Sequence, residues 1–497
     1  MNRLWCTCLA LLLVLIYLPS RAEKVFDFND RCKQAYHEII KLKLNNGQQL
    51  LNAEKAEHPD NLIPYFLENY IDFFVLFFNE DPAEYKKRLS NRDTRLEKMG
   101  EGPEKSPFLL FTRSVIHFQW AAVRVKFGNN WDAGWEFRRS YIQIKKNLEA
   151  FPDFTPNLLY AGAMQVAAGT IPDGYKWLSN LLGINGSIKK GMARMVNFIN
   201  SENEWKWLFN DEAIFYYGYL SFYVQNDKVS IFNVIEKKHY DVVNNHLLTY
   251  LAANLYRNSQ NAEKAEAVLK NRNTSDDYMA TPVWDMEMGY NKIHSLDPDA
   301  ALYLERFIAT FRGKFYVKDV LQKLSWHYYL QGDDAKAKAY RQKVLKSGST
   351  YSEADKQAQK EALTSVWPNK ILLQARLLND GGNYKQALTL LHGKNAGSFA
   401  LPEEKLEFAY RAGRIYDDMG NDSMGIVFYK QAIELGEHRK EHFAARAALQ
   451  IGYIFEQRHD KQTAKQWFQR CMEMEDHDFK NSLDQRAKAG LARCNNE

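Results

Sequence analysis

Cysteine is scarce in this chain of 497 residues, which has only five. Cys6 and Cys8 lie in the apolar segment at the N-terminus, so three remain for the rest of the chain: Cys32, Cys471 and Cys494. An odd number of widely spaced cysteines does not match a disulfide framework or a zinc knuckle. The fold must therefore rest on an apolar core, for which 45% hydrophobic residues are sufficient.

Long hydrophobic runs are also missing, with one exception at the N-terminus. Residues 4–18 form an apolar run that Pro19 ends, and residues 20–22 (SRA) place small residues at the two positions that precede a signal-peptide cut. The run has about 15 residues, whereas a membrane span needs roughly 20. We therefore predict a signal peptide over residues 1–22, cleaved after Ala22. An uncleaved membrane anchor is the alternative.

The predicted signal peptide implies an exported protein. The destination would be the periplasm or cell envelope in a bacterium and the secretory pathway in a eukaryote. A second apolar run of spanning length does not occur in the sequence. We therefore expect the mature chain not to be an integral membrane protein.

A large excess of charge of one sign is absent too. The chain has 66 basic and 61 acidic residues, a net charge of +5. Loss of residues 1–22 removes two basic residues and no acidic one, which leaves about +3. Such a balance gives no support to a nucleic-acid partner, which a basic patch or domain would indicate.

Apolar–polar alternation with a period of two is rare, and the apolar pattern is helical nearly throughout. Residues 409–436 (AYRAGRIYDDMGNDSMGIVFYKQAIELG) show a repeating unit most clearly. Gly413 falls on a first expected helix, residues 420–422 (GND) supply a turn, and Gly425 falls on a second expected helix. This unit resembles the tetratricopeptide repeat, a helix hairpin in which small residues let the two helices approach closely. The resemblance implies an all-α solenoid.

The spacing of twelve residues between two small residues recurs along the chain. It occurs at Ala375/Ala387, Ser325/Ala337, Gly289/Ala301 and Ala253/Ala265, and more weakly at Gly218/Ser230, Gly162/Gly174, Ala121/Ala133 and Ala35/Gly47. From Ala253 the first positions follow one another at 36, 36, 50, 38 and 39 residues. Such a register predicts stacked hairpins.

The predicted organisation has three parts. After the signal peptide, residues 23–240 form an irregular helical region, and residues 241–497 form a solenoid that is closed by a C-terminal capping helix. We predict a very apolar, buried helix at residues 62–82. We predict an exposed segment with a loop at residues 87–107. The 50-residue gap in the register predicts an extra polar helix or an extended loop near residues 346–363.

A glycine- and lysine-rich stretch, residues 171–192 (IPDGYKWLSNLLGINGSIKKGM), raises the question of a phosphate-binding loop. Gly186 and Gly191 have the spacing of a P-loop, but Met192 and Ala193 stand where Lys and Ser or Thr are required, and no strand precedes them. We interpret the stretch as a helix, a turn at Gly183 and a second helix start near Ser187, with glycines that serve close packing.

The same region, residues 156–195, also resembles a segment of the eukaryotic tetratricopeptide repeat protein 39 family. The matching residues are Pro172, Leu178, Leu181, Gly183, Gly186 and Gly191. The family typically has paired prolines where this chain has Pro172-Asp173. The resemblance implies a non-enzymatic, cytosol-facing role, which conflicts with the predicted signal peptide.

Two further motifs point to chemistry. Residues 438–442 (HRKEH) match the H-x-x-E-H zinc-protease pattern, in which His438 and His442 would bind zinc and Glu441 would act as base. They follow Gly436, where one predicted hairpin ends and the next begins, so we interpret them as a solvated charged turn. The acidic pairs at 417–418 and 333–334 are expected to cap helices. We therefore predict no catalytic, cofactor-binding or metal-binding residue, and no nucleotide.

The function that this pattern favours is an exported, non-catalytic scaffold that binds a protein or peptide in the concave face of the solenoid. The alternative is a helical carbohydrate- or small-ligand-binding protein of a bacterial cell envelope. A helical cell-wall hydrolase is the third possibility, and the lack of a convincing acid–base site argues against it.

Overall fold

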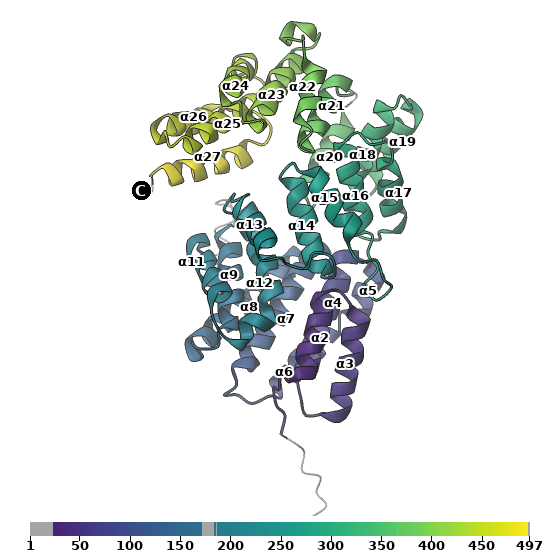
Figure 1. Ribbon diagram of the computed structural model, residues 1–497, viewed down its shortest axis with the longest axis vertical. Helices are drawn as coiled ribbons and strands as arrows, with labels where there is room; N and C mark the ends of the chain where they lie inside the picture. The colour runs from purple at the N-terminus through teal and green to yellow at the C-terminus, as the bar shows by residue number, and fades with distance from the viewer. Residues whose placement is uncertain (1–22, 171–182, 185, 365, 496–497) are drawn as a thin grey trace, which may run out of the picture. The chain divides into compact units, whose positions relative to one another are not determined.

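The computed structural model describes residues 23–170, 183–184, 186–364 and 366–495 of the chain. In these ranges the protein is built from α-helices that pair with their neighbours in the sequence (Figure 1). The only β pairing in the described residues is an isolated parallel bridge between Val25 and Asn61. The predicted all-α class and the helix-hairpin solenoid are thereby confirmed.

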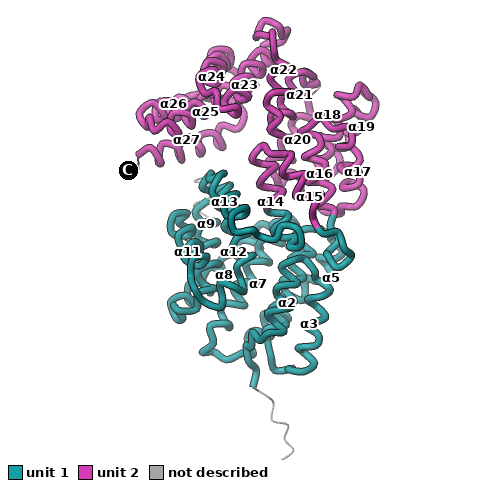
Figure 2. The backbone as a smooth tube through the Cα atoms, viewed as in Figure 1, with its two compact units in different colours: residues 1–251, 273–281 teal, residues 252–272, 282–497 magenta. Residues whose placement is uncertain are grey.

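The chain forms two compact units, which Figure 2 shows in different colours. Unit 1 comprises Met1–Leu251 and Asn273–Thr281, and unit 2 comprises Ala252–Arg272 and Pro282–Glu497. The boundary predicted after residue 240 was drawn from the regularity of the repeats and stays a prediction. The predicted signal peptide lies outside the described residues.

Unit 1 is a set of helices of unequal length. They are α2 (Asp30–Ile40), α3 (Leu44–Glu57), α4 (Ile63–Asn79), α5 (Pro82–Arg88), α6 (Asn91–Gly100), α7 (Pro107–Lys126), α8 (Asn130–Ala150), α9 (Pro156–Gly169), α11 (Ile188–Asn200), α12 (Glu204–Tyr223), α13 (Ser230–Lys237) and the first part of α14 (His246–Asn258). The predicted apolar helix at residues 62–82 is α4, in which most residues are buried.

Unit 2 is the more regular array, with one helix hairpin following another. Its helices are the second part of α14, α15 (Ala262–Asn271), α16 (Val283–His294), α17 (Ala300–Thr310), α18 (Val317–Leu330), α19 (Asp334–Lys346), α20 (Glu353–Leu363), α21 (Lys370–Asp380), α22 (Tyr384–Leu391), the 3-10 turn η2 (Ala396–Ser398), α23 (Pro402–Asp418), α24 (Asp422–Gly436), α25 (Phe443–Gln457), α26 (Lys461–Glu473) and α27 (Lys480–Asn495). The extra polar helix predicted near residues 346–363 is α20.

The small residues of the repeat lie where helices meet. A Cβ built on Gly413 would come within 2.7 Å of the Tyr429 ring, across the α23–α24 hairpin. Ser325 uses its hydroxyl in the same way, since Oγ donates a 2.8 Å hydrogen bond to the carbonyl of Ala337. Ala375 and Ala387 are both fully buried in the α21–α22 hairpin. The spacing of twelve residues therefore marks the close crossing of each of these hairpins.

The last helix closes the array as predicted. Cβ atoms on Gly452 of α25 and on Gly490 of α27 would each lie within 2.6 Å of the Phe468 ring. One phenyl ring of α26 is thus enclosed by two glycines from helices on either side of it. Cys471 and Cys494, on α26 and α27, are free and buried.

The predicted pair Gly162/Gly174 stays a prediction, because Gly174 lies outside the described residues. Among the described residues, Gly162 lies close to Gly191 of α11. A Cβ on Gly162 would lie 2.7 Å from the carbonyl oxygen of Gly191, and one on Gly191 would lie 2.6 Å from that of Gly162. Because a spacing rule detects only a local hairpin, it could not find two helices that meet across a longer connection.

The prediction for residues 87–107 is wrong in part, since α6 occupies Asn91–Gly100 and buries Arg95 and Met99. The segment is rich in charge, which favours an exposed loop when the chain is considered alone. Arg95 is buried because a carboxylate from another helix, Asp72 of α4, accepts a hydrogen bond from it.

No described helix is long and apolar enough to cross a membrane.

Gly425→Leu is expected to destabilise unit 2 by about 1–3 kcal/mol, the usual cost of overpacking. A Cβ at this position would already be 3.3 Å from backbone atoms of Asp417 and Gly413, which cannot rotate away as a side chain can. On a free helix surface the same change would stabilise, because Gly is a poor helix former. The melting temperature decides between the two, and an unchanged or raised value would contradict the close crossing.

Candidate functional site

The glycine- and lysine-rich stretch lies partly outside the described residues, which resume at Gly183. Gly183 has φ +65°, the left-handed conformation expected of a glycine turn. Helix α11 then begins at Ile188, and Ser187 caps it by accepting a 3.3 Å hydrogen bond from the amide of Lys190. The element before the stretch is helix α9 and not a strand. The predicted turn and second helix are confirmed, and the first helix of the stretch lies outside the described residues.

Gly186 and Gly191 of this stretch pack against α9, whereas Lys189 and Lys190 do not. A Cβ on Gly186 would overlap with the backbone of Gly169, and Gly191 meets Gly162 as described above. Lys189 and Lys190 are both exposed. The geometry therefore supports the packing interpretation of the glycines.

Gly183→Val is expected to lower the free energy of unfolding by at least about 1 kcal/mol, because a β-branched residue is strained at φ +65°. No atom of the described residues lies within 4 Å of a Cβ at this position, so the expected cost is that of backbone strain. The double change Lys189→Ala/Lys190→Ala should leave stability unchanged. Urea unfolding measures both. A thermal shift with ATP or GTP that the lysine changes remove would contradict the packing interpretation.

The H-x-x-E-H motif at residues 438–442 lies in the connection between α24 and α25 and not on a helix. The side chain of His438 is 91% exposed, and Glu441 forms an ion pair of 2.7 Å with Arg439. His442 is half-buried and packs on Phe443 and Phe479. The two histidines therefore do not share a helix face. Among the described residues, no group of three His, Cys, Asp or Glu side chains could hold a metal ion.

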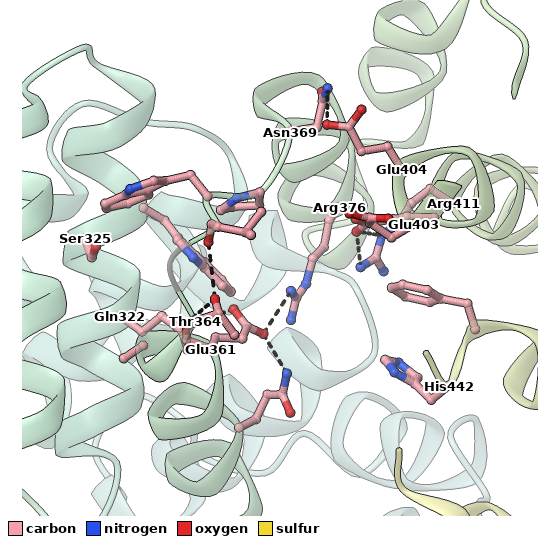
Figure 3. A pocket seen from close by; sticks show the side chains of 18 of the residues that line it. Gln322, Ser325, Glu361, Thr364, Asn369, Arg376, Glu403, Glu404, Arg411 and His442 are labelled. Carbon is pink, nitrogen blue, oxygen red and sulfur yellow. Dashed lines mark hydrogen bonds and ion pairs between the residues drawn. The ribbon is translucent and has the colours of Figure 1, made fainter. Parts of the chain in front are cut away.

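His442 departs from the predicted solvated turn, because it lines a cavity of unit 2. This cavity has a volume of about 470 Å³. Its walls come from α18, α21, α23 and α25, the first helices of their hairpins, and from α19, α20 and the segment after α20. Figure 3 shows Arg376 and Arg411 entering the cavity, with His442 on the same side.

The cavity is lined by both arginines and carboxylates. Arg414 pairs with Asp380 at 2.7 Å; burial opposes ionisation of this carboxyl, but Arg414 outweighs it and lowers the pKa of Asp380. Arg411 pairs with Glu407 at 2.8 Å along the same helix. Arg376 lies 3.9 Å from the nearest oxygens of Asp380 and of Glu361. Most of these charges are therefore engaged, although not equally tightly.

Aromatic rings form part of the same wall. The ring of Trp367 stacks on Tyr329 at 4.7 Å between centroids, and the guanidinium of Arg341 lies 4.5 Å from its centre. Trp326 has Arg376 at 4.8 Å and Lys323 at 4.4 Å from its ring. The cavity thus combines cations, anions and aromatic rings that are themselves covered by cations.

Sequence reasoning did not single out the side chains of this cavity. A signal was present, because Arg376, Arg411 and Arg446 follow one another at intervals of 35 residues, close to the period of the repeat. Side chains that recur at nearly the repeat period lie on the same side of successive hairpins in a solenoid. An arginine on a helix is usually a solvated residue, so the three were not predicted to form a site.

The acidic pairs at 333–334 and 417–418 were both predicted to cap helices, and only the first does so. Asp333 caps α19 by accepting a 3.0 Å hydrogen bond from the amide of Lys336, as predicted. Asp417 and Asp418 do not cap a helix, since they are the last residues of α23. Asp418 instead accepts hydrogen bonds from Gln260 and Asn379, and Asp417 accepts one of 2.9 Å from the Tyr429 hydroxyl.

Asp417→Asn is expected to stabilise unit 2 at pH 8 by about 1–2 kcal/mol and to have little effect at pH 4. Burial raises the pKa of Asp417 to about 6, although the hydrogen bond from Tyr429 opposes it. The folded wild type therefore keeps a proton that the unfolded chain has lost, and stability falls as the pH rises from about 4 to 6. Melting temperatures across this range test it, and a pH-independent difference would contradict the raised pKa.

Comparison with known proteins identifies a repeat within this unit. The family model of the tetratricopeptide repeat matches residues 406–436, which include most of α23 and all of α24. No curated protein matches the chain. The resemblance to the tetratricopeptide repeat protein 39 family is not shown by these comparisons.

Proposed function

We propose that the protein is an exported, non-catalytic scaffold that binds a protein or peptide segment in the cavity of unit 2. The observation that carries the proposal is the cavity of about 470 Å³ on the first helices α18, α21, α23 and α25. Stacked hairpins expose one continuous inner face, and an extended peptide can lie along it. The tetratricopeptide match at residues 406–436 supports the same use, since its first helix, α23, contributes to this wall.

The lining suits a peptide because it offers several kinds of contact in one space. Leu401 is 42% exposed at the rim and provides an apolar contact. Glu403 and Glu404 lie beside it on α23, Arg411 enters the cavity from the same helix, and Arg376 enters from α21. A chain with mixed side chains can satisfy these groups in turn, as a concave site with a few placed polar groups requires.

The carbohydrate-binding alternative has weaker support in this cavity. Sugar rings bind on free aromatic faces, but Trp367 is stacked on Tyr329 and covered by Arg341. Trp326 likewise has Lys323 and Arg376 near its ring. A sugar would have to displace these cations, each of which stabilises its ring contact by about 0.5–2 kcal/mol.

Site-specific photo-crosslinking tests the proposal. A photoreactive phenylalanine analogue at Leu401 should capture a peptide segment of a defined partner in the native compartment, identified by mass spectrometry of the crosslinked peptide. The same analogue at Val427, which is 58% exposed on α24 and outside the cavity, is the matched control. Equal capture at both positions, or none at Leu401, would contradict a peptide site in the cavity.

The export part of the proposal rests on the sequence of residues 1–22 and has its own test. N-terminal sequencing of the protein from its source should give a mature chain that begins at Glu23. A chain that retains Met1 and stays with the membrane fraction would contradict cleavage and favour the anchor.

A further inference from the structure

Three arginines lie on three successive first helices of unit 2. Arg376 lies on α21, Arg411 on α23 and Arg446 on α25, and all three line the cavity. Arg411 is 7% exposed and the side chain of Arg376 is 28% exposed, so water screens them only in part. Figure 3 shows Arg376 and Arg411 in the same part of the cavity as His442.

The carboxylates of the cavity engage the members of this group, the arginine cluster, unequally. Glu407 forms its 2.8 Å pair with Arg411. Asp380 and Glu361 both lie 3.9 Å from Arg376, and Asp380 is already held at 2.7 Å by Arg414. Arg446 forms no ion pair with any residue that the structure describes. The cluster therefore contains one loosely paired and one unpaired guanidinium in a partly desolvated site, an arrangement that an anionic ligand would complete.

His442 lines the same cavity and is influenced by the three arginines. Burial lowers its pKa most, and the charges of Arg446, Arg411 and Arg376 lower it further, to about 2. From α27's side, His477 adds a fourth effect in the same direction. The imidazole is thus neutral at physiological pH and remains available as a hydrogen-bond donor or acceptor beside the arginines.

We propose that Arg376, Arg411 and Arg446 form an anion subsite of the cavity that takes a phosphate group carried by the bound peptide. A guanidinium presents a planar fork of donors that matches phosphate oxygens in pairs. A phosphate monoester has three terminal oxygens and nearly two negative charges, and so can accept from three guanidinium groups at once. A single carboxylate has two oxygens in one plane and one charge, and leaves the cluster incomplete.

The inference rests on the proposed function for the peptide that carries the phosphate, but its test does not. Inorganic phosphate is titrated into the purified full chain by calorimetry at pH 7.5, with ionic strength held constant because surface charges are screened by salt. We expect one site per chain. Arg446→Gln is the decisive variant, since this side chain has no ion pair among the described residues to lose.

Arg446→Gln should weaken phosphate binding about ten- to a hundredfold, as the loss of a charge-assisted contact does. Arg446→Lys, which keeps the charge and loses the fork, should fall between the two. Arg486→Gln, an exposed arginine of α27 outside the cavity, is the matched control and should bind as the wild type does. NMR should also show the pKa of His442 rising when phosphate binds.

Two outcomes would overturn the inference. One is unchanged phosphate binding by Arg446→Gln. The other is binding of succinate as tight as that of phosphate, which would mean that the cluster binds paired carboxylates. A capture at Leu401 without phosphate binding would overturn this inference and leave the proposed function standing. Phosphate binding that Arg446→Gln removes, without capture at Leu401, would leave the anion subsite and contradict its peptide carrier.

Discussion

Glu136→Ala should lower the free energy of unfolding of unit 1 by about 3–5 kcal/mol, as the removal of one partner from a buried ion pair does. Glu136 is 1% exposed on α8 and lies within ion-pair distance of three basic side chains. Its oxygens lie 2.6 Å from Nδ1 of His117, 2.8 Å from Nε of Arg92 and 3.2 Å from Nε of Arg124. One carboxylate therefore joins α6, α7 and α8.

The expected cost comes from the arginines that remain. Burial alone would raise the pKa of Glu136, but the hydrogen bonds from His117 and Arg92 outweigh it and lower the pKa. The carboxylate is thus ionised in the folded protein, and alanine would leave two largely buried guanidinium groups without it. Their side chains are only 11% and 16% exposed for Arg92 and Arg124, so water could replace the carboxylate only in part.

Two variants separate this cause from others. Asp132→Ala removes the other partner of Arg124, at 2.9 Å, but Asp132 is 59% exposed, so the expected cost is about 0–1 kcal/mol. Glu136→Gln keeps an acceptor and loses the charge, and should fall between the two. Urea unfolding followed by circular dichroism measures all three. A cost for Glu136→Ala as small as that for Asp132→Ala would show that this carboxylate is not what holds the helices together.

This network also explains what sequence reasoning missed in unit 1. Residues 87–107 read as exposed because a run of charges is normally solvated. Arg92 donates to Glu136 of α8, which lies 44 residues further along the chain. Arg95 in the same way donates to Asp72 of α4. Neither carboxylate is recognisable in the sequence as a partner, because pairing of this kind depends on tertiary packing and leaves no local period.

The repeats were predictable for the opposite reason, since a hairpin is a local structure. In α7 and α8 the predicted pair Ala121/Ala133 is buried, and further from the turn Ser114 and Ser140 exchange hydrogen bonds of 2.9 and 2.7 Å between hydroxyl and carbonyl. Both pairs are symmetrical about the same turn, as antiparallel helices require. The cavity was not predictable in this way, because its walls come from several hairpins and its arginines recur only from one repeat to the next.

Gly382→Ala should destabilise unit 2 by about 3 kcal/mol or more, well beyond the cost at other turn glycines. Gly382 follows α21 with φ +86°, where any L residue is strained. A Cβ there would also overlap the carbonyl oxygen of Gln260, far inside the 3.0 Å below which Cβ atoms are essentially never found. The obstacle is backbone, so no side-chain rotation can relieve it.

Gly332→Ala is the matched control, because Gly332 ends α18 in the same kind of turn at φ +82° but has nothing within 4 Å of a Cβ. Its expected cost is about 1–2 kcal/mol, the strain of a left-handed alanine. Both glycines belong to unit 2, so the two variants report on the same unfolding transition. The difference between their melting temperatures isolates the close approach of the α21–α22 turn to the α14–α15 turn, where Ala262 donates a 3.1 Å hydrogen bond to the carbonyl of Gly381. Equal costs would mean that the two turns do not touch, and that the order of α21 against the first hairpin of unit 2 has another source.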